Sequence, residues 1–240
     1  MRFTLSAGEA VTAELIEQWR ACTGAPIVVG YGQTETPTAT LTDPGVTPAN
    51  GMIGRPMAGN RVTVIDERGG ETQPGVQGDI AFAADDPGLM LGYWRDGRME
   101  PGRTRAGPHG TWYLSGDCGY RDANGDLYFV GREDDIISSA GYRIGPTEVE
   151  DALMQHPAVL ECAVAASPDE LRGEVVKAFV VLRPGVEPGA PLASALQEHV
   201  KRLIAPYKYP RRVAFVRSLP RTASGKLLRR VLREAESRTR

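Results

Sequence analysis

A hydroxyl and a carboxylate stand side by side in the segment Gly30-Tyr31-Gly32-Gln33-Thr34-Glu35. Oxygen ligands of this kind suit Mg²⁺, and a neighbouring hydroxyl can hold a phosphate that the metal ion bridges. The spacing begins like the dinucleotide-binding pattern G-x-G-x-x-G, but Glu35 replaces the last glycine and a loop follows where that pattern requires a helix. A dinucleotide site is therefore excluded, and the segment is either an ordinary turn or a metal and phosphate site.

A second carboxylate ends a strand-like run in Ser115-Gly116-Asp117. A hairpin follows, because Asn124-Gly125 lies between two strand-like runs and both residues accept a positive φ. A carboxylate at the end of a strand could accept two hydrogen bonds from the diol of a ribose. Gly-Asp is also common in plain turns, so this segment alone is compatible with both interpretations.

A lysine near the C-terminus lies in the glycine-containing segment Thr222-Ala223-Ser224-Gly225-Lys226. The segment lacks the upstream glycine and the hydroxyl residue after the lysine that a P-loop requires. A compact ammonium on such a loop is still suited to stabilising negative charge on a reacting phosphate or carboxylate. Two further turns carry charge: Ala140-Gly141-Tyr142-Arg143, and Glu133-Asp134-Asp135, whose acids lack EF-hand spacing and are more typical of an exposed turn.

The elements that must position these residues are predicted from periodicity and from turn signals. Helices are expected at 13–22, 146–156, 190–204 and from about 226. Strands are expected at 26–31, 61–66, 78–84, 112–114, 159–166, 175–182 and 213–216, with a hairpin over 120–130 and long loops at 36–60 and 95–111. This order predicts an α+β fold with a β-rich first domain, residues 1–132, and a small α+β domain, residues 133–240.

The composition limits the classes of function. With 240 residues, 41% of them hydrophobic, and three scattered cysteines, the chain is expected to be cytoplasmic, without disulfides, a zinc site or a membrane span. The three histidines are scattered and look like surface or packing residues. Residues 201–240 hold 13 Lys and Arg against 2 Asp and Glu, although the whole chain has a formal charge of -2. Because few aromatic residues accompany this basic segment, a solvated helix is expected there and nucleic-acid binding is not.

The order and spacing of the motifs together resemble the adenylate-forming superfamily, which includes acyl-CoA synthetases, peptide-synthetase adenylation domains and firefly luciferase. The resemblance extends from about residue 5 to residue 233. It is carried by Ser6-Ala7-Gly8-Glu9, Tyr31-Gly32-Gln33-Thr34-Glu35-Thr36, Ser115-Gly116-Asp117, Gly131-Arg132-Glu133-Asp134-Asp135, Gly141-Tyr142-Arg143-Ile144 and Pro220-Arg221-Thr222-Ala223-Ser224-Gly225-Lys226. The stretch from Gly141 to Glu150 and the later Arg172-Gly173-Glu174-Val175-Val176-Lys177 look most like medium-chain acyl-CoA synthetases.

The resemblance implies an AMP-forming ligase of fatty acid metabolism that activates a carboxylic acid with ATP and Mg²⁺ and transfers it to coenzyme A. It assigns each matching residue a role. Gly8 and Glu9 would lie against adenine with Tyr31 stacking nearby, and Asp117 and Arg132 would hold the ribose. Thr34 would touch phosphate and Glu35 would bind Mg²⁺. Asp134 would be a hinge, Gly141, Tyr142 and Arg143 would line the CoA path, and Lys226 would stabilise charge during adenylation.

Members of this family are usually more than twice this length. The phosphate-gripping loop and the acyl pocket of the family precede the first motif found here, so the resemblance implies a C-terminal portion that is truncated or split. Activity would then require the N-terminal portion, in cis or as a partner chain. The alternative is a non-catalytic adenylate-binding or interaction module. Residues 1–131 are expected to be poorly stable alone, because their strands would lack neighbours, whereas 133–240 could fold independently.

Overall fold

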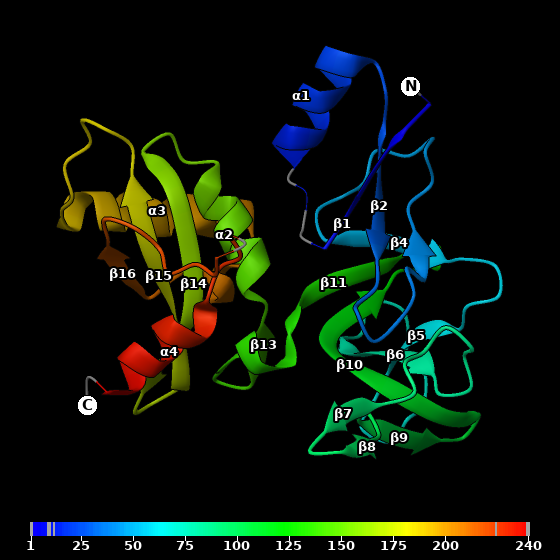
Figure 1. Cartoon of the computed structure of the whole chain (residues 1–240). Coiled ribbons are helices and arrows are strands. Elements are labelled where there is room, and N and C mark those ends of the chain that lie inside the picture. The colour runs from blue at the N-terminus through cyan, green and yellow to red at the C-terminus, as the bar shows by residue number, and fades with distance from the viewer. Residues whose placement is uncertain (1, 9–10, 12, 224, 239–240) are drawn as a thin grey trace. The chain divides into compact units, whose positions relative to one another are not determined.

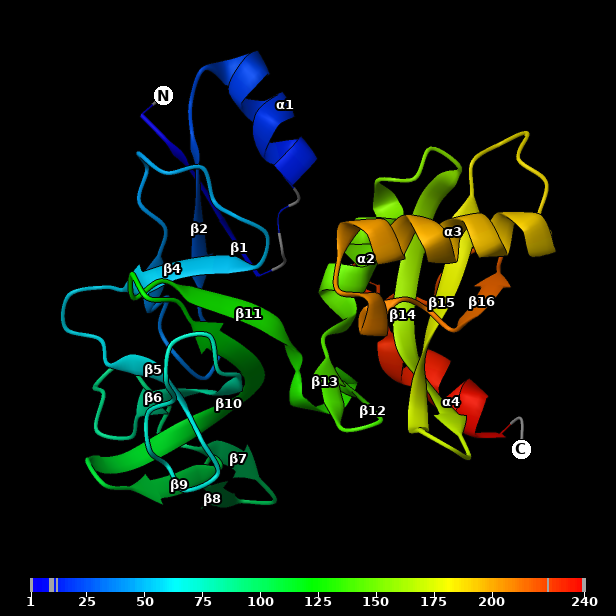
Figure 2. The same ribbon diagram turned by 180° about the vertical axis from the view of Figure 1, so that it is seen from behind.

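The computed structural model describes residues 2–8, 11, 13–223 and 225–238 (Figures 1 and 2). Contacts between backbone positions divide the chain into two compact units, residues 1–133 and residues 134–240. Both units mix helices with a larger share of strands, which confirms the predicted α+β class.

The first unit is mostly β-structure, with one α-helix among its described residues. Its elements in chain order are β1 (Thr4–Ala7), α1 (Ala13–Thr23), β2 (Ile27–Tyr31), β3 (Thr40–Leu41), β4 (Met52–Pro56), β5 (Val62–Ile65), β6 (Gly78–Ala83), β7 (Tyr93–Arg95), β8 (Arg98–Glu100), β9 (Thr104–Gly107), β10 (Gly110–Arg121), β11 (Leu127–Arg132) and the 3-10 helix η1 (Glu133–Asp135).

Nine strands of this unit form one sheet in the order β1-β2-β3-β4-β11-β10-β6-β5, with β9 also pairing with β10. The β1-α1-β2 crossover makes β1 and β2 parallel, and the other pairs are antiparallel. Strand β10 is twelve residues long and bends where its pairing shifts register, so one strand reaches from β9 to β11. Figure 1 shows this curved strand in green.

The core of the first unit lies on both faces of β6 and β10. Ile80, Phe82 and Tyr113 belong to the larger cluster, and Ala81 and Trp112 to the cluster on the opposite face. This alternation follows from the period of two along a strand. Burying both faces fixes the register of β10, and with it the position of residues 115–117.

Two segments that the sequence indicated as long loops contain short strands. Strands β3 and β4 lie within 36–60, where Gly54 has φ +79° and a Cβ there would lie 2.0 Å from the Leu41 carbonyl oxygen. Strands β8 and β9 lie within 95–111, and β7 turns into β8 at Asp96-Gly97, whose φ angles are +49° and +76°. Strands this short carry too few residues for a periodic signal, although Asp-Gly is itself a hairpin signal.

The second unit is a sheet with helices on both faces. Its elements are β12 (Ile137–Ser139), β13 (Tyr142–Ile144), α2 (Pro146–Met154), β14 (Val159–Asp169), β15 (Gly173–Leu182), α3 (Ala190–Leu203), the 3-10 helix η2 (Pro206–Lys208), β16 (Arg212–Phe215) and α4 (Arg229–Arg238). The strand order is β13-β12-β15-β14, and β16 pairs in parallel with β15. Helices α2 and α3 supply Leu153 and Leu196 to one core cluster, and α4 supplies Leu232 to the other.

The last helix begins at Arg229 rather than near 226. Thr222 N donates to the Lys226 carbonyl oxygen and Leu228 N donates to the Pro220 carbonyl oxygen, so residues 220–228 close a small loop before the helix starts.

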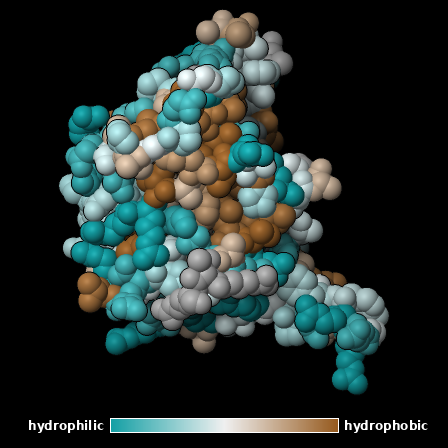
Figure 3. Space-filling view, turned by 90° about the vertical axis from the view of Figure 1, so that its left-hand side faces the viewer, coloured by the Kyte–Doolittle hydropathy of each residue, from teal (hydrophilic) through white to brown (hydrophobic). Residues whose placement is uncertain are grey.

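Half-buried apolar side chains lie along residues 213–216, at and just after the edge strand β16. Figure 3, which faces that side of the chain, shows apolar side chains gathered in the middle of the view.

Candidate functional site

The most deeply buried carboxylate of the candidate site is Asp117, whose residue surface is 4% exposed. It lies on β10 opposite Arg132 of β11, in the stretch where the pairing of β10 with both neighbours shifts register. Gly116, just before it, adopts φ +74°, which lets the backbone turn the carboxylate inward. The bulge therefore places the Asp117 carboxylate in contact with Tyr31 and Gln33, which precede it by 86 and 84 positions.

One oxygen of Asp117 is held by two donors from the end of β2. The hydroxyl of Tyr31 and the side-chain amide of Gln33 each donate to Oδ2 at 2.7 Å. The other oxygen, Oδ1, faces Nη1 of Arg132 at 2.9 Å as an ion pair. It accepts no well-aligned hydrogen bond from any residue that the structure describes.

Burial raises the pKa of the Asp117 carboxyl above its ordinary value of 3.8. The hydrogen bond from Tyr31, the charge of Arg132 and the hydrogen bond from Gln33 oppose that shift. Burial, and then the charge of Asp117, raise the pKa of Tyr31 well above 10.0, so its phenol stays protonated and donates. The site thus holds a carboxylate in a poorly solvated position by means of polar partners.

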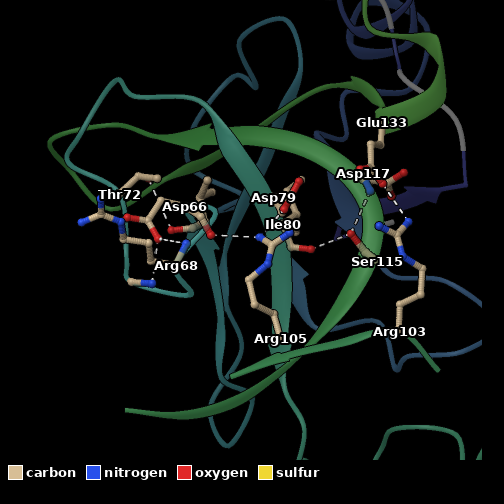
Figure 4. A network of polar contacts seen from close by, with 12 residues as sticks. Asp66, Arg68, Thr72, Asp79, Ile80, Arg103, Arg105, Ser115, Asp117 and Glu133 are labelled. Carbon is tan, nitrogen blue, oxygen red and sulfur yellow. Dashed lines mark hydrogen bonds and ion pairs between the residues drawn. The ribbon is translucent and has the colours of Figure 1, made fainter. Parts of the chain in front are cut away.

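Ser115 anchors the bulge to the neighbouring strand (Figure 4). Its Oγ donates to the Ile80 carbonyl oxygen at 2.6 Å and accepts from the backbone N–H of Asp117 at 3.1 Å. Further along the same sheet, Arg105 reaches Asp79 and the carbonyl oxygen of Asp66, and Arg103 pairs with Glu133 at 2.8 Å. Ser115 thus joins β10 to β6, Arg105 joins β9 to β6, and Arg103 joins the segment before β9 to η1.

Thr34 and Glu35 lie on a tight turn directly after β2. Thr36 N donates to the Gln33 carbonyl oxygen at 3.2 Å, and Gln33 N donates to Thr36 Oγ1 at 2.8 Å. Thr34 is exposed and Glu35 is half-buried, with Tyr93 donating to Glu35 Oε1 at 3.1 Å. A Cβ on Gly32 would lie 2.2 Å from the Pro37 carbonyl oxygen, so only glycine fits there. The turn therefore presents hydroxyl and carboxylate oxygens outward.

The parallel pairing of β1 and β2 places the end of β1 beside this turn. Ala7 is paired with Gly30, so Gly8, at φ +91°, follows at the same sheet edge as Tyr31. Ligands of parallel sheets bind outside the carboxyl ends of the strands. Glu9, the other predicted adenine-contacting residue, lies outside the described residues.

Lys226 is exposed in the loop that precedes α4. The loop is closed by Thr222, whose Oγ1 accepts from Lys226 N at 3.0 Å, and by Gly225 at φ +90°. Arg221 Nη1 donates to the Gly225 carbonyl oxygen at 2.8 Å and its Nη2 pairs with Glu161 at 2.8 Å. Within the described part of the chain, no hydrogen bond or ion pair holds the Lys226 ammonium.

The predicted CoA-lining residues lie on the turn from β12 to β13. Ala140 and Gly141 adopt φ angles of +49° and +85°, which makes the hairpin turn tight. The Tyr142 ring stacks on Tyr207 with centroids 4.2 Å apart, and both rings are about half exposed. Arg143 is exposed on β13. The result is an aromatic surface next to a cation.

The acidic run at the unit boundary is an anchor and not a metal cluster. Asp134 is exposed in η1 at the start of the second unit, whereas Asp135 pairs with Arg233 of α4 at 2.9 Å. No group of three or more potential metal ligands occurs among the residues that the structure describes. Helix α4 is held further by Arg229, which pairs with Glu150, and by Glu236, which accepts from Lys177 at 2.6 Å. Much of the basic charge of this helix is therefore used within the unit.

Sequence reasoning missed two features. Gln33 was taken only as a turn residue, and its donation across 84 positions to Asp117 leaves no local signal. His156 and His199 were expected to be surface or packing residues, but the sequence did not indicate that their rings pack against each other, edge to face at 5.1 Å between α2 and α3. Cys22, Cys118 and Cys162 form no disulfide in this structure.

Comparison with known proteins identifies the family. Residues 1–94 match the AMP-binding enzyme family, and residues 148–226 match the AMP-binding enzyme C-terminal domain. The chain belongs to the AMP-binding enzyme superfamily. Its second unit accordingly contains the C-terminal domain of these enzymes, and its first unit contains the C-terminal part of their large domain.

Curated relatives of this chain include mitochondrial acyl-coenzyme A synthetases. Mouse ACSM3 is 45% identical over 98% of this chain. Human ACSM4 is 46% identical over all of this chain. The chain spans only 41% and 42% of the length of these relatives. Because both are mitochondrial by name, they do not support the expected cytoplasmic location, which stays a prediction. None of the described helices is long and apolar enough to cross a bilayer.

Solved structures of other members of the superfamily share the fold of this chain. The anthranilate CoA ligase AuaEII in complex with anthranoyl-AMP is 34% identical with a TM-score of 0.82, and 98% of this chain aligns with 45% of it. ATP-bound MatB from Rhodopseudomonas palustris is 29% identical with a TM-score of 0.84, and all of this chain aligns with 46% of it. Members of the superfamily thus bind ATP or an acyl-adenylate in this fold.

Proposed function

We propose that this chain is the C-terminal portion of an AMP-forming acyl-CoA synthetase. In the first reaction a carboxylate oxygen attacks the α-phosphorus of ATP, the bond to the β-phosphate breaks, and pyrophosphate leaves. In the second, the sulfur of coenzyme A attacks the acyl carbonyl carbon, AMP leaves with the pair of electrons from the C–O bond, and the thiol proton is lost. The buried Asp117, held at the carboxyl edge of the sheet beside the Thr34-Glu35 turn, carries the proposal.

Asp117 and Arg132 would hold the ribose. A hydroxyl that donates to a buried carboxylate forms a charge-assisted hydrogen bond, which is about twice as strong as a neutral one. Asp117 is 4% exposed and is therefore shielded from competing water. Gly8 and Glu9 would border adenine, as the resemblance implies. The ring of Tyr31 is itself buried and stacks on Phe82 with centroids 6.2 Å apart, so its clearest contribution here is the hydroxyl bound to Asp117.

Thr34 and Glu35 would meet the phosphates. One oxygen of Glu35 accepts from Tyr93, and its Oε2 accepts no hydrogen bond from the described residues. A single carboxylate together with substrate phosphates is the usual ligand set for Mg²⁺ in phosphoryl-transfer sites. The donor set fits that ion, which would neutralise charge on the phosphates when bound. Thr34, on the exposed side of the turn, would donate its hydroxyl to a phosphate oxygen.

The second unit would supply two different groups in turn. Lys226 would bring an ammonium to the developing negative charge during adenylation. The Gly141-Tyr142-Arg143 turn would line the path of coenzyme A, with Arg143 facing phosphate and the stacked Tyr142 beside the pantetheine. Asp134 would be the hinge for the exchange of one group for the other, since it is exposed at the unit boundary.

Carboxylate-dependent exchange of pyrophosphate into ATP tests the proposal. We expect no exchange by this chain alone, because it spans 41% of its relatives, and exchange when the N-terminal portion of an ACSM-type relative is supplied. AMP should bind to the chain in calorimetry in both cases. Binding of AMP without exchange in the reconstituted complex would favour the non-catalytic adenylate-binding module instead.

Replacing Lys226 separates the two half-reactions. Lys226→Ala in the reconstituted complex should lower the rate of adenylation by about 10²–10³, as loss of one charge-stabilising donor does elsewhere. Formation of the thioester from preformed acyl-adenylate should be unchanged. Lys201→Ala is the control, since the Lys201 ammonium pairs with Glu198 and lies over the Tyr209 ring within the second unit. Equal loss of both half-reactions in Lys226→Ala would refute the role given to this lysine.

A further inference from the structure

The boundary between the two units falls within a single turn of 3-10 helix, η1, between Glu133 and Asp134. The turn consists of three acidic residues in a row. Consecutive carboxylates repel one another, so such a run is most stable when its members are paired or solvated. A 3-10 turn also has poorer hydrogen-bond geometry than an α-helix and is more easily rewound. The partners of the three acids therefore decide which part of the turn can change its conformation.

The first acid of the turn is fastened to the first unit. Glu133 follows Arg132, the last residue of β11, which lies in register with Asp117 of β10. The Glu133 carboxylate accepts from Nη1 of Arg103 at 2.8 Å, and Arg103 lies in the segment before β9 (Figure 4). Backbone pairing up to Arg132 and this ion pair hold Glu133 to the sheet of the first unit.

The last acid of the turn is fastened to the second unit. Nη1 of Arg233 on α4 donates to Oδ1 of Asp135 at 2.9 Å, and the two side chains are only 27% and 15% exposed. Ile136 and Ile137 follow and are buried, Ile137 in the same core cluster as Leu153 of α2. Because Asp135 is poorly solvated, removing Arg233 would leave a charge without compensation.

We infer that the Arg103–Glu133 and Arg233–Asp135 ion pairs are two clamps that confine the pivot between the units to the backbone of Asp134. Asp134 is exposed, and its carboxylate pairs with no other residue in the part of the chain that the structure describes. The inference rests on the proposed function, in which the second unit supplies two groups in turn. A pivot of one residue would return that unit to the same two orientations in every cycle. Arg103 and Arg233 are thus positioning residues.

Hydrogen exchange of the full chain without nucleotide tests the clamps. Arg233→Met should speed exchange at the backbone amides of residues 133–137 about ten-fold, because the turn then opens locally. Arg103→Met should speed it less, since its pair with Glu133 is more exposed. Arg230→Met is the matched control for Arg233→Met, because Arg230 lies on the same helix and forms an exposed pair with Glu234 of that helix.

Reversing the charges of one clamp provides a rescue. Asp135→Arg combined with Arg233→Asp keeps an ion pair of opposite polarity, so hydrogen exchange should return toward the wild-type rate, whereas either single reversal should not restore it. In the reconstituted complex, Arg233→Met should slow adenylation and thioester formation equally, each by about ten-fold, because both need an orientation that the pivot sets. The double reversal should restore both rates. Lys226→Ala, by contrast, should slow adenylation alone.

The outcomes separate this inference from the proposed function. Unchanged hydrogen exchange in Arg233→Met would overturn the clamp, and so would an equal rise throughout β14 and β15, because the pair would then only stabilise the second unit. Local opening of the turn with unchanged half-reactions in an active complex would overturn the positioning role. An inactive wild-type complex, with the expected hydrogen exchange in the variants, would overturn the proposed function and leave the clamps standing.

Discussion

At the scale of single residues, the candidate site is organised by one buried carboxylate. Asp117 gains polar partners from a turn and from a neighbouring strand, yet burial still raises its pKa above 3.8. Between the unfolded and folded pKa values the folded chain binds more protons than the unfolded chain, so the free energy of unfolding falls as pH rises through that window. At neutral pH the ionised carboxylate therefore lowers stability, which is a common feature of binding sites.

Replacing this carboxylate should separate stability from binding. Asp117→Asn keeps an acceptor for Tyr31 and Gln33 and removes the buried charge, so at pH 7 we expect the free energy of unfolding to stay equal or to rise by about 1 kcal/mol. AMP binding should be lost. Urea denaturation and calorimetry measure the two effects, with the exposed Asp85→Asn as control. A clearly destabilised Asp117→Asn chain would contradict this account of the site.

Whether the sequence alone could identify a residue of the candidate site depends on how many positions separate that residue from its partners. Thr34, Glu35 and Asp117 stood out because their types follow strand ends, and the parallel pairing of β1 with β2 places Gly8 at the same edge. Their roles are still proposals. Gln33 gave no signal, because its partner is 84 positions away and is brought near only by the bulge in β10.

At the scale of elements, the sequence predicted the boundary of a helix correctly where a residue such as proline marks it. Helix α2 begins at Pro146 as expected, since proline at the first turn loses no helical hydrogen bond. The start of α4 was placed too early, because the Lys226 carbonyl oxygen accepts from Thr222 N in a loop instead of accepting a helical hydrogen bond. Strands β3 and β4 escaped detection because two to five residues do not establish a period.

The contact between α2 and α3 should make the second unit sensitive to mild acid. His156 follows α2 and lies against His199 of α3. Its Nδ1 accepts from Ala158 N at 3.2 Å. Burial, and then the charges of His199 and Arg202, lower the pKa of His156 below 6.5. The unfolded chain therefore binds more protons just below pH 6.5, and stability is lost as pH falls from that value toward the folded pKa.

Comparison of two pH values checks this expectation. The urea midpoint of the wild-type chain should be lower at pH 5.5 than at pH 7.5, because the unfolded chain binds the additional proton more readily than the folded chain. In His156→Asn, where an amide oxygen replaces Nδ1 as acceptor, the fall should be smaller. His109→Asn, at an exposed position of the first unit, is the control. Identical pH dependence in the wild type and His156→Asn would show that this histidine does not contribute.

At the scale of the whole molecule, the two units differ in how completely they bury their apolar side chains. The second unit has a core on each face of its sheet. In the first unit the edge strand β1 and the segment before it leave Leu5 54% and Phe3 50% exposed, and Leu15 of α1 is equally exposed. An apolar sheet edge of this kind favours association with another segment or chain.

Limited proteolysis should reveal this difference. With trypsin at low concentration, a fragment near residues 134–240 should persist after the first unit is degraded, because helices cover a core cluster on each face of its sheet and ion pairs hold its last helix. Mass spectrometry identifies the fragments over time. Persistence of an intact fragment near 1–133 with early loss of the second unit would contradict the expected order of stability.

The ion pairs that hold α4 limit how fast Lys226 can move over a long distance. The loop before α4 is joined to β14 by the ion pair of Arg221 with Glu161, and α4 itself is joined to α2 by the ion pair of Arg229 with Glu150. A loop clamped at both ends cannot carry its ammonium far by local fluctuation on the nanosecond scale. Any long excursion of Lys226 must therefore be a rigid-body displacement of residues 134–240, and its rate would be governed by the backbone torsions around Asp134.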